Sequence, residues 1–456
     1  MNEEDIQSAQ KITAFDCNEK KHELENLATK ILNNISNKGA FTAQISMGLT
    51  QGVSLEVRKQ QIETLEFNCD KGLTITVFEG LKKGHASTTD FSEEGLERTI
   101  EAALSIAHYA AEDPCAGLAD KELLATEFKE LELYHPWETS IDEMISLALK
   151  TEKATLDYDD RISNTDGCSI STYEGLSLLS NSQGFMGFKK GTRHSLSTVA
   201  IASDDSGMQR DYYYSSNRDA KLLEAGEAIG VKAASRTVAK LNAGTPESGK
   251  WPVIFSPEMA RSLFGHFLSA IQGGQIYRKS SFLVDAIGRD IFPSWLSLKE
   301  EPHIINGHAS KTFDAEGVAT HPKYFVENGV LSQYLLSSYS ARRLSMKTTG
   351  NAGGISNVRI SHQEKDQKEL IQSVSKGLLV TELMGQGVNM VTGDYSRGAS
   401  GFWIENGKIQ YPVRGVTIAG NLSNIFAGIT QIGNDIDTRS ALYTGSVLVD
   451  EMTVAN

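Results

Sequence analysis

Two Asn-Gly pairs, each placed between two alternating strands, restrict the fold of this chain more than any other feature. Both residues of such a pair adopt positive φ, which joins the flanking strands in a tight antiparallel hairpin. The pairs are Asn328-Gly329 and Asn406-Gly407, and the strands beside them are 324–327, 330–331, 402–405 and 408–411. The last third of the chain therefore folds around antiparallel sheet.

Helix and strand patterns alternate in the first half of the chain. A polar amphipathic helix is expected up to about Asn37. Alternating apolar residues then predict strands over 53–57 and 73–77, with turns at 70–72 and 79–80.

Three more helices are expected before residue 240. Ser92 is a good N-cap for a helix that ends near Asp113-Pro114, and Ser140 and Glu143 form a capping box for the next. The third helix is predicted from an apolar stripe of Leu222, Ala225, Ile229 and Ala233.

A turn-rich segment over 242–249 marks the main domain boundary. We expect an N-terminal α+β domain over 1–241, which could divide further into 1–115 and 125–241, and a β-rich domain over 242–456.

Two glycine- and lysine-rich turns, 79–84 and 187–191, hint at an internal repeat. The fold class is α+β: a strand-and-helix domain followed by a strand-dominated, glycine-rich one, with a strand at 253–255 and a helix from Pro257 to about Ile271.

Composition limits the kind of partner. The 456 residues carry a net charge of -14, which repels phosphate backbones, so no nucleic-acid binding is expected. The four cysteines fit no disulfide framework and the acidic N-terminus is no signal peptide. No apolar run is long enough to span a membrane. We therefore expect a cytoplasmic chain without membrane contact.

The histidines do not form a metal-binding pattern. None of the ten histidines has another three or four residues away, as a zinc site on a helix requires. His303 and His308 are five apart in an irregular segment, and His266 stands alone in a predicted helix. A solvent-exposed role for the first two and a packing role for His266 are the simpler interpretations.

The densest polar segment is 392–401, which contains our candidate peptide-binding residues Gly393, Asp394, Tyr395, Ser396, Arg397 and Gly398. Asp394 and Arg397 could pair with each other, or Arg397 could bind a carboxylate or a peptide carbonyl. The alternative is a glycine-rich strand with a surface ion pair. A second segment, 348–354, could hold an anion through backbone N–H groups or be an ordinary loop.

Several strings resemble the PmbA/TldE side of the TldD/PmbA metallopeptidase family. The longest is TELMGQGVNMVTGDYSRGASGFWIENGKIQYPV, and others are DPCAGLADKELL, LFGHFLSAIQGGQIYRKSSFL, TGNAGGISNVRI, TIAGNL and GNDI. The resemblance runs from about residue 40 to the end of the sequence. It implies a subunit of a cytosolic metalloprotease that cleaves unfolded or small peptides, including an antitoxin and a peptide-antibiotic precursor. The family has also been described as a modulator of DNA gyrase.

In the TldD subunit of that family, a helix carries His-Glu-x-x-x-His and a cysteine near the C-terminus completes the metal site. Here the corresponding helix reads Gly265-His266-Phe267-Leu268-Ser269-Ala270-Ile271, and Tyr443-Thr444-Gly445 stands where the cysteine is expected. No catalytic or metal-binding residue is therefore carried over to this chain. The resemblance implies no cofactor here and zinc in a TldD-type catalytic paralogue, with which this chain forms a heteromer.

Three functions remain open from the sequence. In the first, the chain is inactive alone and completes a peptide-binding chamber, with a peptide adding to a sheet edge at 393–401. In the second, it is a non-proteolytic binding protein that modulates gyrase or an RNA-binding regulator. In the third, it is an autonomous peptidase using His266, His303 or His308. The sequence leaves homodimer formation open.

Overall fold

The computed structural model describes residues 14–39 and 41–456. The segment 1–13, on which the expectation of no signal peptide rests, lies outside the described residues. Two compact units divide the chain. The N-terminal unit contains the described residues up to 202 together with 210–238 and 312–320, and the C-terminal unit contains 203–209, 239–311 and 321–456.

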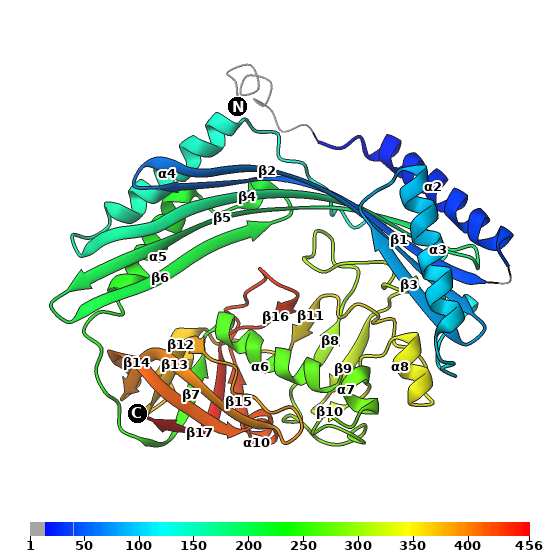
Figure 1. Cartoon of the computed structure of the whole chain (residues 1–456). Coiled ribbons are helices and arrows are strands. Elements are labelled where there is room, and N and C mark those ends of the chain that lie inside the picture. The colour runs from blue at the N-terminus through cyan, green and yellow to red at the C-terminus, as the bar shows by residue number, and fades with distance from the viewer. Residues whose placement is uncertain (1–13, 40) are drawn as a thin grey trace. The chain divides into compact units, whose positions relative to one another are not determined.

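A six-stranded sheet forms the N-terminal unit, in the order β3-β2-β1-β4-β5-β6. Its strands are β1 (Thr42–Arg58), β2 (Gln61–Glu79), β3 (Lys82–Thr88), β4 (Ile162–Asn181), β5 (Met186–Asp204) and β6 (Gly207–Asn217). Buried residues alternate along β1 because one face of the sheet carries the helices. Figure 1 shows these helices over the sheet, α2 and α3 at one end and α4 at the other.

The helices of this unit are α2 (Cys17–Asn37), α3 (Glu93–Tyr109), α4 (Ile141–Leu156) and α5 (Gly226–Val238), with single 3-10 turns at Lys121–Leu123 and Ala220–Leu222. The predicted caps are confirmed, because Ser92 caps α3 and Ser140 forms a capping box with Glu143. The third helix begins later than expected. Leu222 lies in a separate 3-10 turn and is 57% exposed, so it is not part of the apolar stripe of α5.

Two predicted turns are wrong. Residues 70–72 continue β2, because the 17-residue strand β1 offers each of them a partner, with Gly72 opposite Gly48. Residues 187–191 lie inside β5. A Cβ on Gly187 would lie 2.6 Å from the ring of Phe313, so this glycine makes room for an aromatic ring and does not form a turn. The helix α3 also ends at Tyr109, before the expected Asp113-Pro114.

Two sheets form most of the C-terminal unit. One has the order β14-β13-β12-β7-β17-β15, and a further pairing of β14 with β17 closes it into a ring of five strands. The other has the order β10-β9-β8-β11-β16. The first contains β7 (Gly249–Phe255), β12 (Lys376–Met384), β13 (Asp394–Glu405), β14 (Lys408–Asn421), β15 (Ile429–Ile432) and β17 (Val447–Ala455). The second contains β8 (Leu298–Glu300), β9 (Lys323–Glu327), β10 (Val330–Leu331), β11 (Val358–Ile360) and β16 (Leu442–Tyr443).

Both Asn-Gly hairpins are confirmed. Glu327 pairs with Val330 and Glu405 pairs with Lys408, and all four turn residues have positive φ. Five helices accompany the sheets: α6 (Pro257–Ala270), α7 (Gly273–Tyr277), α8 (Ser338–Arg343), α9 (Gln367–Gln372) and α10 (Leu422–Ala427). The α+β class, with a strand-dominated C-terminal part, is therefore confirmed.

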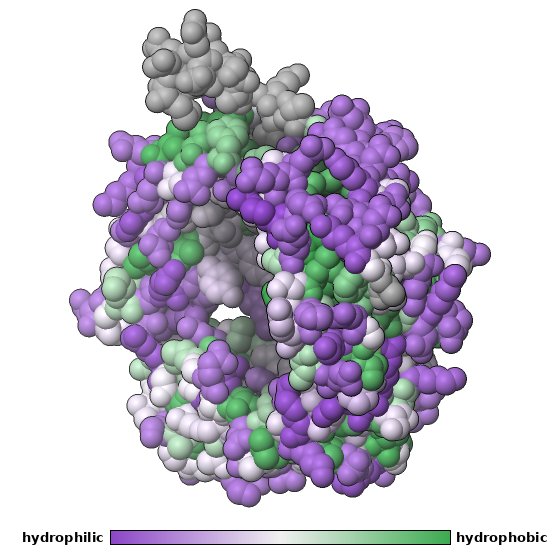
Figure 2. Space-filling view, turned by 45° about the vertical axis from the view of Figure 1, so that its right-hand side comes forward, coloured by the Kyte–Doolittle hydropathy of each residue, from purple (hydrophilic) through white to green (hydrophobic). Residues whose placement is uncertain are grey.

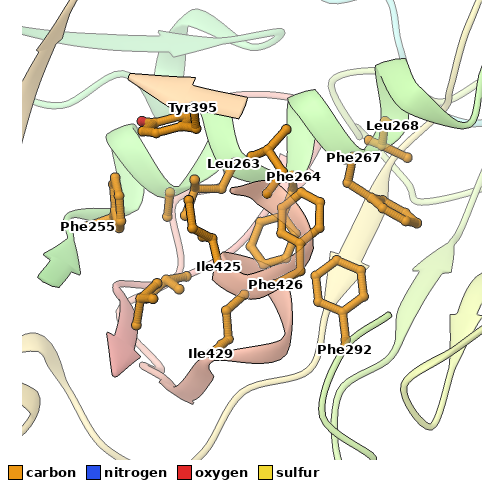
Figure 3. Packing of buried hydrophobic residues seen from close by; sticks show 14 of the residues in the cluster. Phe255, Leu263, Phe264, Phe267, Leu268, Phe292, Tyr395, Ile425, Phe426 and Ile429 are labelled. Carbon is orange, nitrogen blue, oxygen red and sulfur yellow. The ribbon is translucent and has the colours of Figure 1, made fainter. Parts of the chain in front are cut away.

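Helix α6 carries the centre of the C-terminal core. Its residues Leu263, Phe264 and Phe267 are fully buried and pack with Phe292 and Phe426. Figure 3 shows these rings together, with Tyr395 at the margin of the cluster and its hydroxyl oxygen turned away from the phenylalanines. The core thus fixes α6 and the start of β13 against each other.

Hydrophilic residues cover most of the face seen in Figure 2, and the hydrophobic ones form scattered patches. Among residues 14–39 and 41–456, no helix combines the length and the apolar character needed to cross a bilayer.

Candidate functional site

Helix α6 has one apolar and one polar face. Pro257 occupies its first turn, where the missing N–H costs nothing, and apolar residues at helical spacing bury one side. The other side is half-buried and carries Glu258, Arg261, Ser262, Gly265, His266 and Ser269. The candidate site begins on this polar face.

His266, Tyr395 and Arg397 come together at the polar face. The rings of His266 and Tyr395 meet edge to face, with 6.0 Å between their centroids. Tyr395 and Arg397 are two residues apart on β13 and so point to the same side of the strand. The sequence assigned His266 to a separate packing role, because nothing in the spacing of residues 266 and 395 shows that they meet.

Three buried polar atoms of this cluster have no hydrogen-bond partner among the described residues. They are Nε2 of His266, the hydroxyl oxygen of Tyr395 and Nε of Arg397. Burial lowers the pKa of His266, and the nearby charge of Arg397 lowers it further. Burial raises the pKa of Tyr395 to about 12, although the charge of Arg397 and the approach of its guanidinium to the phenol oxygen oppose this rise. At neutral pH the cluster therefore has a neutral imidazole, a protonated phenol and one cation.

The segment 393–401 is not a sheet edge. Residues 394–399 pair with β14 on one side, and on the other side the N–H of Ser396 donates to the carbonyl of Gly387 over 2.7 Å. Further along, β12 pairs with residues 398–405. The prediction of a free sheet edge here is therefore wrong, because both sides of the strand already have backbone partners.

Asp394 and Arg397 do not pair with each other. Asp394 accepts hydrogen bonds from the hydroxyl of Thr392 and the side-chain amide of Asn421. It shares the opposite face of β13 with Ser396, because side chains alternate along a strand. Of the open possibilities, the Asp394–Arg397 ion pair is therefore not formed, for this geometric reason.

The two glycines of the candidate segment have structural roles. Gly393 has φ of +79°, a conformation that favours glycine, and its N–H donates to the carbonyl of Asn389. A Cβ on Gly398 would lie 3.3 Å from the Cβ of Met384. Of the six predicted peptide-binding residues, only Tyr395 and Arg397 thus enter the cluster with His266.

The segment 348–354 contributes one residue, Asn351, to the contacts of an anion that belongs to the chain itself. The buried carboxylate of Glu300 accepts hydrogen bonds from the amide of Asn351 and from the backbone N–H of Ser356, and it pairs with Lys323 over 2.9 Å. The proposed anion cradle is therefore replaced by an internal contact, and the segment is a structural loop.

A network of four charges lies at the N-terminal half of α6, and sequence reasoning missed it. Arg261 pairs with Asp437 over 2.8 Å, and Arg439 contacts both Asp437 and Glu258. All four side chains are less than one-fifth exposed. The only sequence signal was the string GNDI at 433–436, which gave no indication of its partners on α6.

An open hollow of about 530 Å³ lies beside the β8-β9-β11-β16 sheet. Trp295, Tyr324 and Tyr443 line it together with Lys299 and Arg359, and both cations pair with Glu301. Its residues come from five separate segments, so no local pattern could predict it. Because Glu301 pairs with both cations, the hollow offers a ligand less positive charge than its lining suggests.

Three models of the PmbA/TldA metallopeptidase family match the chain. Domain 1 matches residues 43–107, the central domain matches 134–241 and the C-terminal domain matches 248–456. The chain belongs to the PmbA/TldA metallopeptidase family.

Relatives of this PmbA/TldA chain cover nearly its whole length. It is 48% identical over 413 residues to the metalloprotease PmbA of Escherichia coli O157:H7, which covers 91% of this chain and 92% of the relative. It is 42% identical to the PmbA homologue of Haemophilus influenzae, over 92% of this chain and 94% of that relative.

Solved structures share the fold of this PmbA/TldA chain. A proposed modulator of DNA gyrase from Bacteroides thetaiotaomicron has a TM-score of 0.90 and 28% identity, over 95% of this chain and 99% of that one. TldE from Thermococcus kodakarensis has a TM-score of 0.82 and 19% identity, over 94% of this chain and 100% of that one, and shows the same fold.

The family name implies a metal, but the residues of this PmbA/TldA chain do not fit one. Within residues 14–39 and 41–456, no three His, Cys, Asp or Glu side chains gather closely enough to hold a metal ion. The charge of Arg397 beside His266 would also repel a cation. If His266 matches the first histidine of His-Glu-x-x-x-His, Phe267 and Ile271 replace the other two residues, and if it matches the last, Arg261 and Ser262 replace them.

Proposed function

We propose that this chain is the non-metallated, peptide-binding subunit of a metalloprotease, and that a TldD-type paralogue supplies the catalytic zinc. The observation that carries the proposal is the arginine beside His266 on the polar face of α6. A cation occupies the surroundings where a metallopeptidase would need anionic or neutral ligands. The chain therefore contributes binding, and the paralogue contributes the chemistry.

In this proposal the substrates are unfolded or small peptides, such as an antitoxin or a peptide-antibiotic precursor. Membership of a metallopeptidase family supports it, and so does the likeness in fold to a protein named TldE. The complex works in the cytoplasm, and this chain meets its substrate and its paralogue there.

The test is cleavage of one unstructured peptide by the purified chain, by the paralogue and by their mixture, each supplied with zinc. We expect no cleavage by the chain alone, cleavage by the mixture, and zinc bound only to the paralogue. Size-exclusion chromatography of the mixture should show a heteromer. Chelator-sensitive cleavage by this chain alone would contradict the proposal and bring back an autonomous site at His266, His303 or His308.

A second candidate function is non-proteolytic binding to gyrase or to an RNA-binding regulator. It is favoured by two solved relatives that are named as proposed modulators of DNA gyrase, with TM-scores of 0.90 and 0.86. The acidic surface would suit a partner with a basic nucleic-acid site. Capture of purified gyrase by this chain without its paralogue would favour this function.

A further inference from the structure

The cluster of His266, Tyr395 and Arg397 contains donors without acceptors. Buried polar atoms are nearly always hydrogen-bonded, and each one left unpaired costs about 1–3 kcal/mol. Here three neighbouring side chains each keep a buried atom without a partner among the described residues. Tyr395 is 1% exposed, so bulk water does not satisfy its hydroxyl.

The charge and the hydrogen-bond donors of the three side chains define which ligand group would complement them. The guanidinium of Arg397 is permanently charged and forms no ion pair with a carboxylate of the described residues. The phenol of Tyr395 keeps its proton and can donate it to a hydrogen bond. The imidazole of His266 can donate through one nitrogen. One positive charge with two or three donors is complementary to a single carboxylate.

Gly265, which precedes His266 on α6, leaves open space on the half-buried face of the helix. It lies within α6, where glycine costs about 1 kcal/mol relative to alanine. A Cβ at this position would meet no atom within 4 Å, so close packing does not require glycine there. Gly398, by contrast, has Met384 within 3.3 Å of its Cβ position. The free space at Gly265 adjoins His266 in the sequence and lies on the polar face of the helix.

We propose that His266, Tyr395 and Arg397 bind one carboxylate group of the peptide substrate, with Gly265 leaving room for the peptide. This inference rests on the proposed peptide-binding role and adds the group that is recognised. The carboxylate belongs either to the C-terminus of the peptide or to an acidic side chain. Arg397 supplies the charge, Tyr395 and His266 supply hydrogen bonds, and none of the three takes part in bond cleavage.

The test uses binding to the purified full-length chain, without the paralogue. Three fluorescent peptides of one unstructured sequence are compared: a free acid, its C-terminal amide, and a variant in which every Asp and Glu is replaced by its amide. We expect one replacement to weaken binding about tenfold or more, and that peptide identifies the source of the carboxylate. Equal affinity for all three peptides would overturn the inference.

Variants of the chain then show whether Arg397 and Tyr395 contact the recognised carboxylate. Arg397→Ala should weaken binding of the preferred peptide about tenfold or more, Arg397→Lys should retain part of it, and Tyr395→Phe should lose severalfold. All three variants should bind the peptide that lacks the recognised carboxylate as the wild type does. A fall in affinity for every peptide alike would indicate a general structural defect and contradict the assignment.

Variants at Gly265 test separately whether the peptide occupies the open space beside this residue. Gly265→Ala and Gly265→Leu should both keep or raise the thermal stability of the chain, because each improves helix propensity and the first meets no neighbour. Gly265→Leu should nevertheless weaken peptide binding. A well-folded Gly265→Leu chain with wild-type affinity would show that the peptide does not use this space.

The two proposals can fail separately. Carboxylate-dependent binding by the chain alone, without cleavage by the mixture, would retain the binding site and reject the protease partnership. Cleavage by the mixture together with equal peptide affinities would retain the partnership and reject the carboxylate site.

Discussion

The imidazole ring of His266 meets the phenol ring of Tyr395 edge to face, with 6.0 Å between the centroids and 73° between the planes. This contact holds the imidazole in the interior, where burial and the charge of Arg397 keep its pKa below the ordinary value of 6.5. The site therefore presents a neutral histidine beside a permanent cation. The pKa of His266 and its effect on stability can both be measured.

We predict that Arg397→Ala raises the pKa of His266 towards 6.5 without reaching it, because burial persists after the charge is removed. An NMR titration of the imidazole resonances would measure the change. Arg397→Lys is the matched control and should leave the pKa low. An equal pKa in all three proteins would show that Arg397 does not act on His266.

The same shift predicts how stability depends on pH. The folded chain binds a proton at His266 less readily than the unfolded chain, so protonation favours the unfolded state. The contribution of His266 to the free energy of unfolding is full above pH 6.5 and falls as the pH drops below it. Denaturant titrations at pH 7.5 and 5.5 should show a smaller decline for His266→Gln than for the wild type.

Asp437 should be a strong stabilising residue of the C-terminal unit. Burial acts to raise its pKa, but hydrogen bonds from Arg439 and the charge of Arg261 outweigh it and hold the pKa below the usual range. Asp437→Ala leaves two largely buried arginines without this partner and should cost about 3 kcal/mol of unfolding free energy. The exposed pair of Lys250 and Glu451 is the control, and Glu451→Ala should change nothing measurable.

Glu152 should be essential to the turn between β1 and β2. Its buried carboxylate accepts the backbone N–H groups of Lys59 and Gln60, which both have positive φ. Glu152→Ala removes these acceptors and should cost the N-terminal unit about 3 kcal/mol. Hydrogen exchange at the turn would report the loss. Lys153→Ala, an exposed change on the same helix, should leave the exchange rates unaltered.

Alanine variants at two glycines of the β13–β14 region can distinguish the cost of backbone strain from the cost of a steric clash. Gly407 and Gly415 both have φ of +70°, but a Cβ at Gly407 would lie 2.8 Å from the carbonyl oxygen of Gln372, whereas one at Gly415 would meet nothing within 4 Å. Gly415→Ala should cost about 1 kcal/mol from strain alone. Gly407→Ala should cost clearly more, and equal melting temperatures for the two variants would refute this reasoning.

Local signals predicted the helices and hairpins well. These signals are Ser92, Ser140 and the two Asn-Gly pairs. Each acts on neighbours within a few residues, so the residue and the structure it forms can both be recognised in one short stretch of sequence. Residues 70–72 look like a turn, but the long partner strand β1 supplies a hydrogen-bonding neighbour for each residue. Tertiary pairing thus overrides local turn preference there.

The candidate site was only half visible in the sequence. The polar segment 392–401 directed attention to Arg397, but the strand position of this residue depends on partners near residues 387 and 418. The meeting of His266 with Tyr395 depends on how α6 packs against the core. Neither relationship leaves a pattern of spacing, which explains why the sequence suggested a sheet edge and an isolated histidine.

The closed sheet of the C-terminal unit sets an order of events during synthesis. Its first strand, β7, needs β17 beside it, so that Gly249 pairs with Val454. On the ribosome, β7 and the helix that follows it must wait for almost the whole remaining sequence before their core can close. The sheet of the N-terminal unit can assemble much earlier, from strands β1 to β6. A nascent chain would therefore expose the phenylalanines of α6 for longer than any apolar residue of the first sheet, and chaperones would have the longest time to bind that helix.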